Sequence, residues 1–236
     1  MPFSQGTISL GTASAGPVRC FGAPMRVSPA ERLTLTLADH HGAALAALLP
    51  LLGCGEEAAT LAFDDLSGSA SDPREAAALA RIADEERTHD VIISALIEAL
   101  PPDPQAAAIR RAARRFHIDL GRDGPTLRLA RMAATDAAVC TILSRLGEAR
   151  RPLANDPVIA TRLRRIHRDE AHHVRVTRAL ANNAGTGRTA RDAGCAAREA
   201  LANVLQLRAC AFEALGVDPQ RLDRDLRILP DGLFAA

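Results

Sequence analysis

The amino-acid sequence predicts an all-α fold, a helical bundle with additional helices at both ends of the chain. Ala, Leu and Arg dominate the 236 residues and β-branched residues are sparse, a composition that favours helix nearly everywhere. The hydrophobic content of 47% suffices for one sizeable core. Around residues 79–100 and 159–180, apolar residues recur at alternating steps of three and four, which is the spacing of a packed helix.

A proline that follows a capping residue predicts where most of the helices begin. Ser28-Pro29-Ala30-Glu31 and Asp72-Pro73-Arg74-Glu75 both have the form of a capping box. The other expected starts are Asp103-Pro104, Gly124-Pro125, Asp156-Pro157 and Asp218-Pro219. The predicted helices span residues 29–50, 55–66, 73–100, 104–119, 125–149, 157–182, 189–215 and 219–227, with a kink or break at Pro50–Gly55. Residues 1–27 are expected to form an irregular N-terminal arm, and residues 28–236 a single helical domain.

The residue types that the chain lacks exclude several classes of chemistry. It contains no Lys, which excludes P-loop nucleotide binding and Schiff-base catalysis, and no Tyr in which a radical could be stored. Its five Cys include no CxxC pair and indicate neither a disulfide framework nor a zinc ribbon. The N-terminus lacks the pattern of a secretory signal, and the longest apolar run, Ala43 to Gly53, is too short to span a bilayer. A cytoplasmic localisation without a membrane partner is therefore expected.

One pattern, L-x-R-I-x-x-[DE]-E-x-x-H, occurs twice, at residues 79–89 and 163–173. Each copy places a Glu and a His three positions apart and therefore on one face of a helix. The residues concerned are Glu86, His89, Glu170 and His173. In both copies this face is the apolar stripe that should be buried, and a buried Glu is costly unless it is neutralised, paired or bound to a metal. Two such helices packed together would form a dinuclear metal site inside a bundle.

A dinuclear bundle site needs one further carboxylate from each of two other helices. In the helix before the second motif, Asp136 is the only acid in the apolar stripe. Before the first motif, Glu56 and Glu57 are both candidates, and Glu57 is preferred because it shares a face with Cys54 and Leu61. Four carboxylates would balance two divalent cations in an apolar core, and carboxylates combined with imidazoles suit iron or manganese.

The order of these residues resembles that of the ferritin-like di-iron carboxylate superfamily, which includes rubrerythrins and di-iron oxygenases. The similarity covers about residues 55–180, with one carboxylate ahead of each ExxH motif. It implies a ferritin-like four-helix bundle that binds two Fe ions, or Mn and Fe, with Glu86 and Glu170 bridging the metals as the catalytic carboxylates. The implied terminal ligands are Glu57, His89, Asp136 and His173. Asp136 departs from the commoner Glu at its position, and a shorter ligand would leave one metal more open.

Other polar residues lie close to the two motifs. In proteins of similar type, the acids at the positions of Glu85 and Asp169 hydrogen-bond a ligand His across the bundle; solvent-facing positions are the alternative. His167 and His172 are alternatives for an additional ligand, although His172 is expected at the surface or behind the ligands. The trio Asp39, His40 and His41 is expected to be an exposed cluster.

These observations predict an oxidoreductase that activates O₂ or peroxide and hydroxylates, N-oxygenates or desaturates a small organic substrate with an external electron donor. A ferroxidase, a rubrerythrin-like peroxidase or another iron-handling protein is the alternative. A tRNA-modifying hydroxylase would use the Arg-rich helix at 104–119 on phosphates, but the net charge of +1 argues against a nucleic-acid partner. A non-catalytic helical module would leave Glu86, Glu170 and Asp136 buried without compensation. The substrate, the electron donor and the oligomeric state, a homodimer included, stay open.

Overall fold

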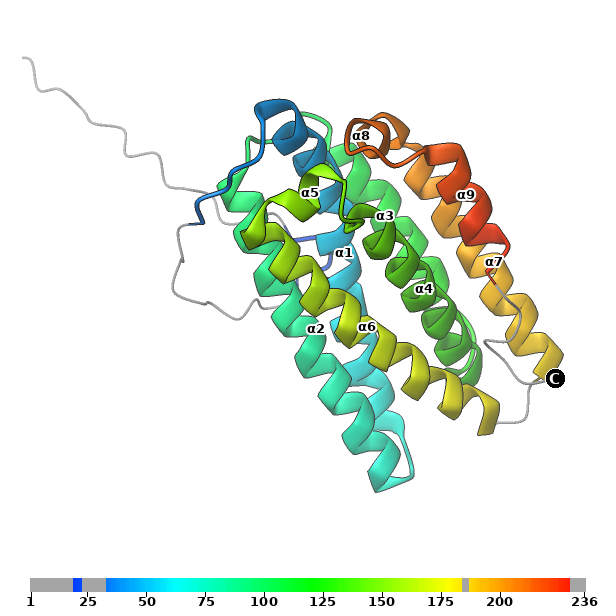
Figure 1. Cartoon of the computed structure of the whole chain (residues 1–236). Helices are drawn as coiled ribbons and strands as arrows, with labels where there is room; N and C mark the ends of the chain where they lie inside the picture. The colour runs from blue at the N-terminus through cyan, green and yellow to red at the C-terminus, as the bar shows by residue number, and fades with distance from the viewer. Residues whose placement is uncertain (1–18, 23–32, 184–186, 230–236) are drawn as a thin grey trace, which may run out of the picture.

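The computed structural model describes residues 19–22, 33–183 and 187–229, and within these ranges every regular element is an α-helix (Figure 1). The helices are α1 (Asp39–Ser69), α2 (Pro73–Ala99), α3 (Ala106–Leu120), α4 (Pro125–Leu146), α5 (Pro152–Asn155), α6 (Pro157–Asn183), α7 (Gly187–Gln206), α8 (Ala209–Ala214) and α9 (Pro219–Arg227). The predicted all-α class is confirmed for the described part of the chain.

Two helix pairs form the centre of the fold. α1 packs along α2, α4 packs along α6, and α2 contacts α6 between the two pairs. α2 and α6 run in opposite directions in Figure 1, so the helices that carry the repeated motif are antiparallel neighbours. α3 connects the two pairs and packs against α1, while α7 covers α4 and α9 packs on α7. α3 and α7 thus cover α1 and α4, while α5 packs on α6.

Aspartate side chains cap three of the helices at the predicted positions. Asp72 accepts a hydrogen bond from the backbone N of Arg74 at 2.8 Å, and Asp218 accepts one from the backbone N of Gln220 at 2.9 Å. Asp156 accepts hydrogen bonds from the first turn of α6 and from the Thr36 hydroxyl at 3.0 Å. These bonds satisfy amide groups that have no partner inside the helix, which is why the sequence predicts where these helices begin.

The start and the continuity of α1 differ from the prediction. Of the expected kink or break at Pro50–Gly55, the break is wrong, because α1 is one uninterrupted helix, and the kink stays a prediction. Pro50 removes one helical hydrogen bond, but Leu49 and Leu51 beside it are buried in the core, and this burial outweighs the loss. The expected capping box at residues 28–31 lies outside the described residues. Residues 33–38 are not helical, so α1 begins later than predicted.

The predicted helix 189–215 is divided into α7 and α8. The interruption falls at Leu207 and Arg208, and Arg208 is buried there. Its guanidinium donates a hydrogen bond to Oε1 of Gln105 at 2.8 Å and pairs with Asp103, both in the connection between α2 and α3. The turn therefore directs the charged Arg208 side chain toward Asp103, a buried partner. A continuous helix would not have needed this contact.

Two hydrophobic clusters fill the bundle, and the polar residues of the motifs lie between them. The larger cluster includes Leu49, Ile93, Ala138 and Ile166, one from each central helix. The smaller cluster includes Phe63, Ile82, Met132 and Ala181, again one from each. On every central helix, the change from one cluster to the other coincides with the candidate ligands. A polar site at this point is enclosed by apolar layers above and below.

By length and composition, α1 is the one described helix that could cross a membrane. However, 61% of its most apolar stretch is buried inside the structure, as in the core helix of a soluble protein. The cytoplasmic localisation stays a prediction.

Candidate metal centre

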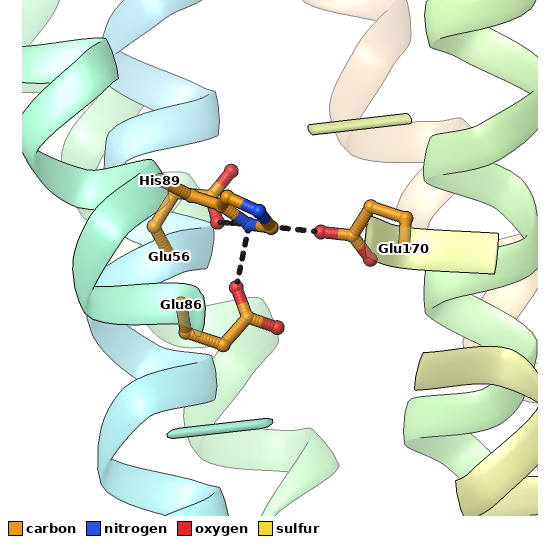
Figure 2. A group of neighbouring side chains, drawn as sticks. All are labelled: Glu56, Glu86, His89 and Glu170. Atoms are coloured by element: carbon orange, nitrogen blue, oxygen red, sulfur yellow. Dashed lines mark hydrogen bonds and ion pairs between the residues drawn. The ribbon is translucent and has the colours of Figure 1, made fainter. Parts of the chain in front are cut away.

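Four buried residues from three helices converge at the centre of the bundle: Glu56 of α1, Glu86 and His89 of α2, and Glu170 of α6 (Figure 2). One ligand atom from each lies within 4.8 Å of the others. Nδ1 of His89 lies 3.3 Å from Oε2 of Glu56, 3.3 Å from Oε2 of Glu86 and 3.6 Å from Oε1 of Glu170. Three carboxylates and one imidazole in this geometry could hold a metal ion.

His173 of α6 adjoins this group and completes the second motif. Its Nδ1 lies 3.1 Å from Oε1 of Glu86 and 3.7 Å from Oε2 of Glu170. Its ring centroid is 5.7 Å from that of His89, and both side chains are fully buried. Each of the two glutamates therefore lies close to both imidazoles, and the two copies of the motif form a single polar cluster.

Asp136 of α4 is buried, and its Oδ2 atom has no hydrogen-bond partner among the described residues. Burial raises the pKa of this carboxyl well above its usual range, and the negative charges of Glu170 and Glu86 raise it further. Leaving a buried carboxylate oxygen without a partner costs free energy that a bound cation would recover. The predicted position of Asp136 beside the two motifs is consistent with this electrostatic coupling.

Glu57, the preferred ligand from α1, does not join the cluster. Its Oε2 accepts a hydrogen bond from the backbone N of Cys20 at 2.6 Å, and its Oε1 accepts one from the backbone N of Phe21 at 2.8 Å. The adjacent Glu56 occupies the expected place instead. The preference for Glu57 is thus corrected in favour of the alternative, because Glu57 faces an N-terminal segment that the sequence gave no reason to place there.

The acids that precede each motif glutamate bind the opposite histidine. Nε2 of His173 on α6 lies 3.0 Å from Oε2 of Glu85 on α2, and Nε2 of His89 on α2 lies 3.4 Å from Oδ2 of Asp169 on α6. The expected contacts across the bundle are therefore confirmed for both acids. They hold Nε2 of each ring outward and leave Nδ1 directed at the cluster, where it is available to a metal.

The remaining candidate residues lie away from the cluster or at the surface. His167 lines a separate cavity of about 210 Å³ beside Leu143 and Arg164. His172 contacts Arg175 at 3.2 Å in an exposed pair, as expected for a surface group. On the basic helix, Arg111, Arg114 and Arg115 are exposed, as are Asp39 and His40 at the start of α1.

The histidines of the cluster are held in their protonated forms. Burial by itself would lower the pKa of His173, but the adjacent carboxylates of Glu170 and Glu86 raise it to about 11. Burial would also lower the pKa of His89, but the adjacent carboxylates of Glu170, Glu56 and Glu86 raise it far above its usual value. The imidazolium charges take the place that a cation would occupy among the carboxylates.

The carboxyl groups of the cluster divide between protonated and ionised forms. Burial raises the pKa of Glu56 well above its usual range, although the adjacent imidazole of His89 opposes this effect. Burial would also raise the pKa of Glu86, but the adjacent imidazoles of His173 and His89 lower it below the usual range. A cluster in which some acids carry protons and others are ionised can accept divalent cations by exchanging those protons.

A cavity of about 190 Å³ is lined by residues of α1, α3 and α4 and extends to Asp136. Its wall is mostly apolar and includes Phe21, Leu61, Leu120 and Met132. Asp136 lines the same cavity, together with Thr135, Arg128 and His117. Burial lowers the pKa of His117 to about 4, so this imidazole is neutral at pH 7. The cavity is large enough for a small molecule and would bring it to Asp136, which is electrostatically coupled to Glu170 and Glu86.

Reasoning from the sequence missed the residues that fasten the N-terminal segment beside the cluster. Both carboxylate oxygens of Asp90 accept hydrogen bonds from the guanidinium of Arg19 at 2.7 Å, and Asp90 is buried. The available signal was Asp90 itself, a second acid four positions after Glu86 on the helix that should be buried. Nothing in residues 19–21 indicated the contact.

Comparisons with protein-family models, with curated protein sequences and with solved structures gave no match. The interpretation of the centre therefore depends on the residues and their geometry.

Proposed function

We propose that this chain is a ferritin-like di-iron oxidoreductase that activates O₂ or peroxide to oxidise a small organic molecule. The observation that carries the proposal is the reciprocal pairing of the two ExxH motifs in one buried cluster. Nδ1 of each histidine faces the cluster, and Nε2 of each is held by an acid of the other helix. Buried carboxylates and imidazoles without a thiolate favour iron or manganese.

The geometry supports a division of roles among the ligands. Glu86 lies 3.3 Å from His89 and 3.1 Å from His173, and Glu170 lies 3.6 Å and 3.7 Å from the same two rings. Because each of them lies close to both imidazoles, Glu86 and Glu170 would be the carboxylates shared by two bound ions. His89 with Glu56, and His173 with Asp136, would be the terminal ligands. The four carboxylates would neutralise two divalent ions inside the apolar core.

Two iron ions, when bound, would supply the redox chemistry that protein side chains lack. The side chains of the chain provide the rest of the site. Glu85 and Asp169 fix the imidazole orientations, and the two hydrophobic clusters keep bulk water from the carboxylates. The cavity lined by Asp136 would orient an organic substrate next to the centre.

The apolar cavity favours oxidation of an organic substrate over the alternative of iron handling. A ferroxidase needs a polar route that attracts Fe²⁺, whereas the lining here is largely Ala, Leu, Met and Phe. Iron handling stays the second candidate function, since the same set of ligands would serve substrate oxidation and iron handling alike.

Metal content per chain tests the centre itself. After anaerobic reconstitution with Fe²⁺, the wild-type protein should bind about two ions, and the Glu86→Ala plus Glu170→Ala variant should bind none. Glu56→Gln and Glu57→Gln form a matched pair of neighbouring residues. We expect the Glu56 substitution to reduce iron content and the Glu57 substitution to leave it unchanged. No iron in the reconstituted wild-type protein would disprove the proposal.

Oxygen consumption distinguishes the two functions. An enzyme that oxidises an organic substrate should stop consuming O₂ once the iron in its own site is oxidised, even when excess Fe²⁺ is present. A ferroxidase should continue until the added Fe²⁺ is exhausted. An oxygen electrode record at two Fe²⁺ loadings, with a chelator added to scavenge unbound oxidised iron, therefore decides between them.

A further inference from the structure

A short N-terminal segment, residues 19–22, is fastened to α1 and α2 beside the metal centre. Glu57 accepts the backbone N–H groups of Cys20 and Phe21, and Arg19 forms two hydrogen bonds with Asp90. These contacts come from buried acids on two different helices. The segment is therefore held at a defined position, although it belongs to no regular element.

The segment brings two thiols together. Cys54 lies on α1 one turn before Glu57, so the bonds that fix the Cys20 backbone at Glu57 place its side chain next to Cys54. The side chain of Cys20 packs against the hydrophobic cluster that contains Cys54, and each of the two thiols shifts the pKa of the other. Both cysteines are free thiols in this structure, Cys54 being buried and Cys20 half-buried. The partly exposed thiol thus offers solvent access to the buried one.

The surroundings of Cys20 favour reaction with an oxidant. The interaction with Cys54 lowers the pKa of the Cys20 thiol, against the opposing effects of burial and the Glu57 charge, and the positive charges of Arg110 and Arg19 lower it further, while the pKa of Cys54 is raised. The thiolate is the nucleophilic form of cysteine, so a lowered pKa increases the fraction that can react at neutral pH. A second thiol packed beside the first can then complete a disulfide.

We propose that Cys20 and Cys54 are a redox-active pair that a hydroperoxide converts into a disulfide. The Cys20 thiolate attacks the terminal peroxide oxygen, the O–O bond breaks, and Cys20 sulfenic acid and an alcohol (water, for hydrogen peroxide) are formed. The Cys54 sulfur then attacks the Cys20 sulfur, the S–S bond forms and the S–O bond breaks, with release of water. The two thiols lose two electrons, which the hydroperoxide accepts.

The disulfide would link the N-terminal segment covalently to α1. Phe21, the next residue, forms part of the wall of the cavity that reaches Asp136. Oxidation would therefore fix one wall of that cavity, while in the dithiol form the segment is held only by non-covalent contacts. The pair would couple peroxide in the surroundings to access at the metal centre, and its formation requires no bound metal.

Thiol counting and peptide mapping test the pair on the full-length chain. The protein is treated with stoichiometric hydrogen peroxide in the presence of a chelator, which prevents iron-dependent side reactions. Free thiols should fall from five to about three, and trypsin should yield residues 20–26 joined to residues 33–74 through one disulfide. Cys195→Ser is the matched control, since it should lose two thiols as well and give the same linked peptide. Cys20→Ser and Cys54→Ser should give no linked peptide.

Hydrogen exchange tests the effect on the segment. In the oxidised protein, the amides of Cys20 and Phe21 should exchange more slowly than in the reduced protein, because local opening then requires movement of α1 as well. Five free thiols after oxidation, or a disulfide that joins other cysteines, would refute the pair. Formation of the expected disulfide with unchanged exchange would refute its effect on the segment. All these readouts are independent of metal loading, so they can fail without affecting the proposed oxidase function.

Discussion

The imidazole of His173 on α6 contacts the carboxylate of Glu85 on α2, with 3.0 Å between Nε2 and Oε2. The reciprocal contact joins His89 on α2 to Asp169 on α6. Each histidine is therefore oriented by the helix that carries the other histidine. The geometry of the candidate centre depends on the docking of the two helix pairs rather than on either pair alone.

Replacing Glu85 with Gln should weaken metal binding without unfolding the protein. The Glu85 side chain is 25% exposed, so it tolerates substitution, but the amide would no longer provide the negative charge that orients His173. We expect metal affinity to fall by about 10- to 100-fold, as measured by competition with a chelator. Asp84→Asn, at the exposed neighbouring acid, is the control and should leave affinity unchanged. Equal affinities for wild type and Glu85→Gln would exclude an orienting role.

Metal binding should release protons at pH 7. In the metal-free protein the pKa values of His89 and His173 are raised, and so are those of Glu56 and Asp136, so these four groups retain protons. Ligation requires all four to be deprotonated, which predicts release of about four protons for two ions. Calorimetric titration in buffers of different ionisation enthalpy measures this number. Binding without proton release would show that the ions occupy some other site.

His117 should make the protein sensitive to mild acid. Burial lowers its folded-state pKa to about 4, below the value of about 6.5 in an unfolded chain, so the unfolded state binds more protons between these limits. This contribution to stability is complete above pH 6.5 and is lost as the pH falls toward 4. We expect His117→Gln to remove up to about 3 kcal/mol of the acid-induced decrease in unfolding free energy. Denaturant titrations between pH 7 and pH 4 measure it, with exposed His40→Gln as the control.

Gly216→Ala should destabilise the connection between α8 and α9. Gly216 has a φ of +79°, and a Cβ added there would lie 3.0 Å from Nη1 of Arg151. We expect a loss of about 1 to 2 kcal/mol in unfolding free energy, since both the backbone conformation and the contact are unfavourable for Ala. Gly68→Ala, within α1 and with open space around the new Cβ, is the matched control. That substitution should be neutral or stabilising by up to about 1 kcal/mol, and an equal effect at both glycines would contradict the explanation.

The parts of the fold that the sequence predicted correctly are those fixed by local chemistry. Asp72, Asp156 and Asp218 cap their helices because a carboxylate satisfies the first amides wherever the helix lies in the fold. The repeated motif was informative for a different reason. Polar residues in an apolar stripe had to contact one another, because their burial without partners would have cost too much free energy.

The errors arose where tertiary contacts decided the outcome. Pro50 lies within an uninterrupted helix because the surrounding leucines are buried, and Arg208 interrupts a predicted helix because its partners lie near residue 103. Glu56 and Glu57 are adjacent acids with equal local preferences. The choice between them depended on residues 19–21, which lie more than thirty positions earlier and contain no periodic pattern.

In the proposed two-metal centre the two halves are nearly alike, but α1 would contribute a Glu where α4 would contribute an Asp. Asp is one methylene shorter, and Asp136 lines the open cavity, whereas Glu56 lies within the enclosed cluster. Two ions bound there would therefore occupy inequivalent positions. We expect them to load in sequence and exchange at different rates, the ion beside Asp136 being the faster, so that a chain carrying a single ion would be a distinct and isolable state.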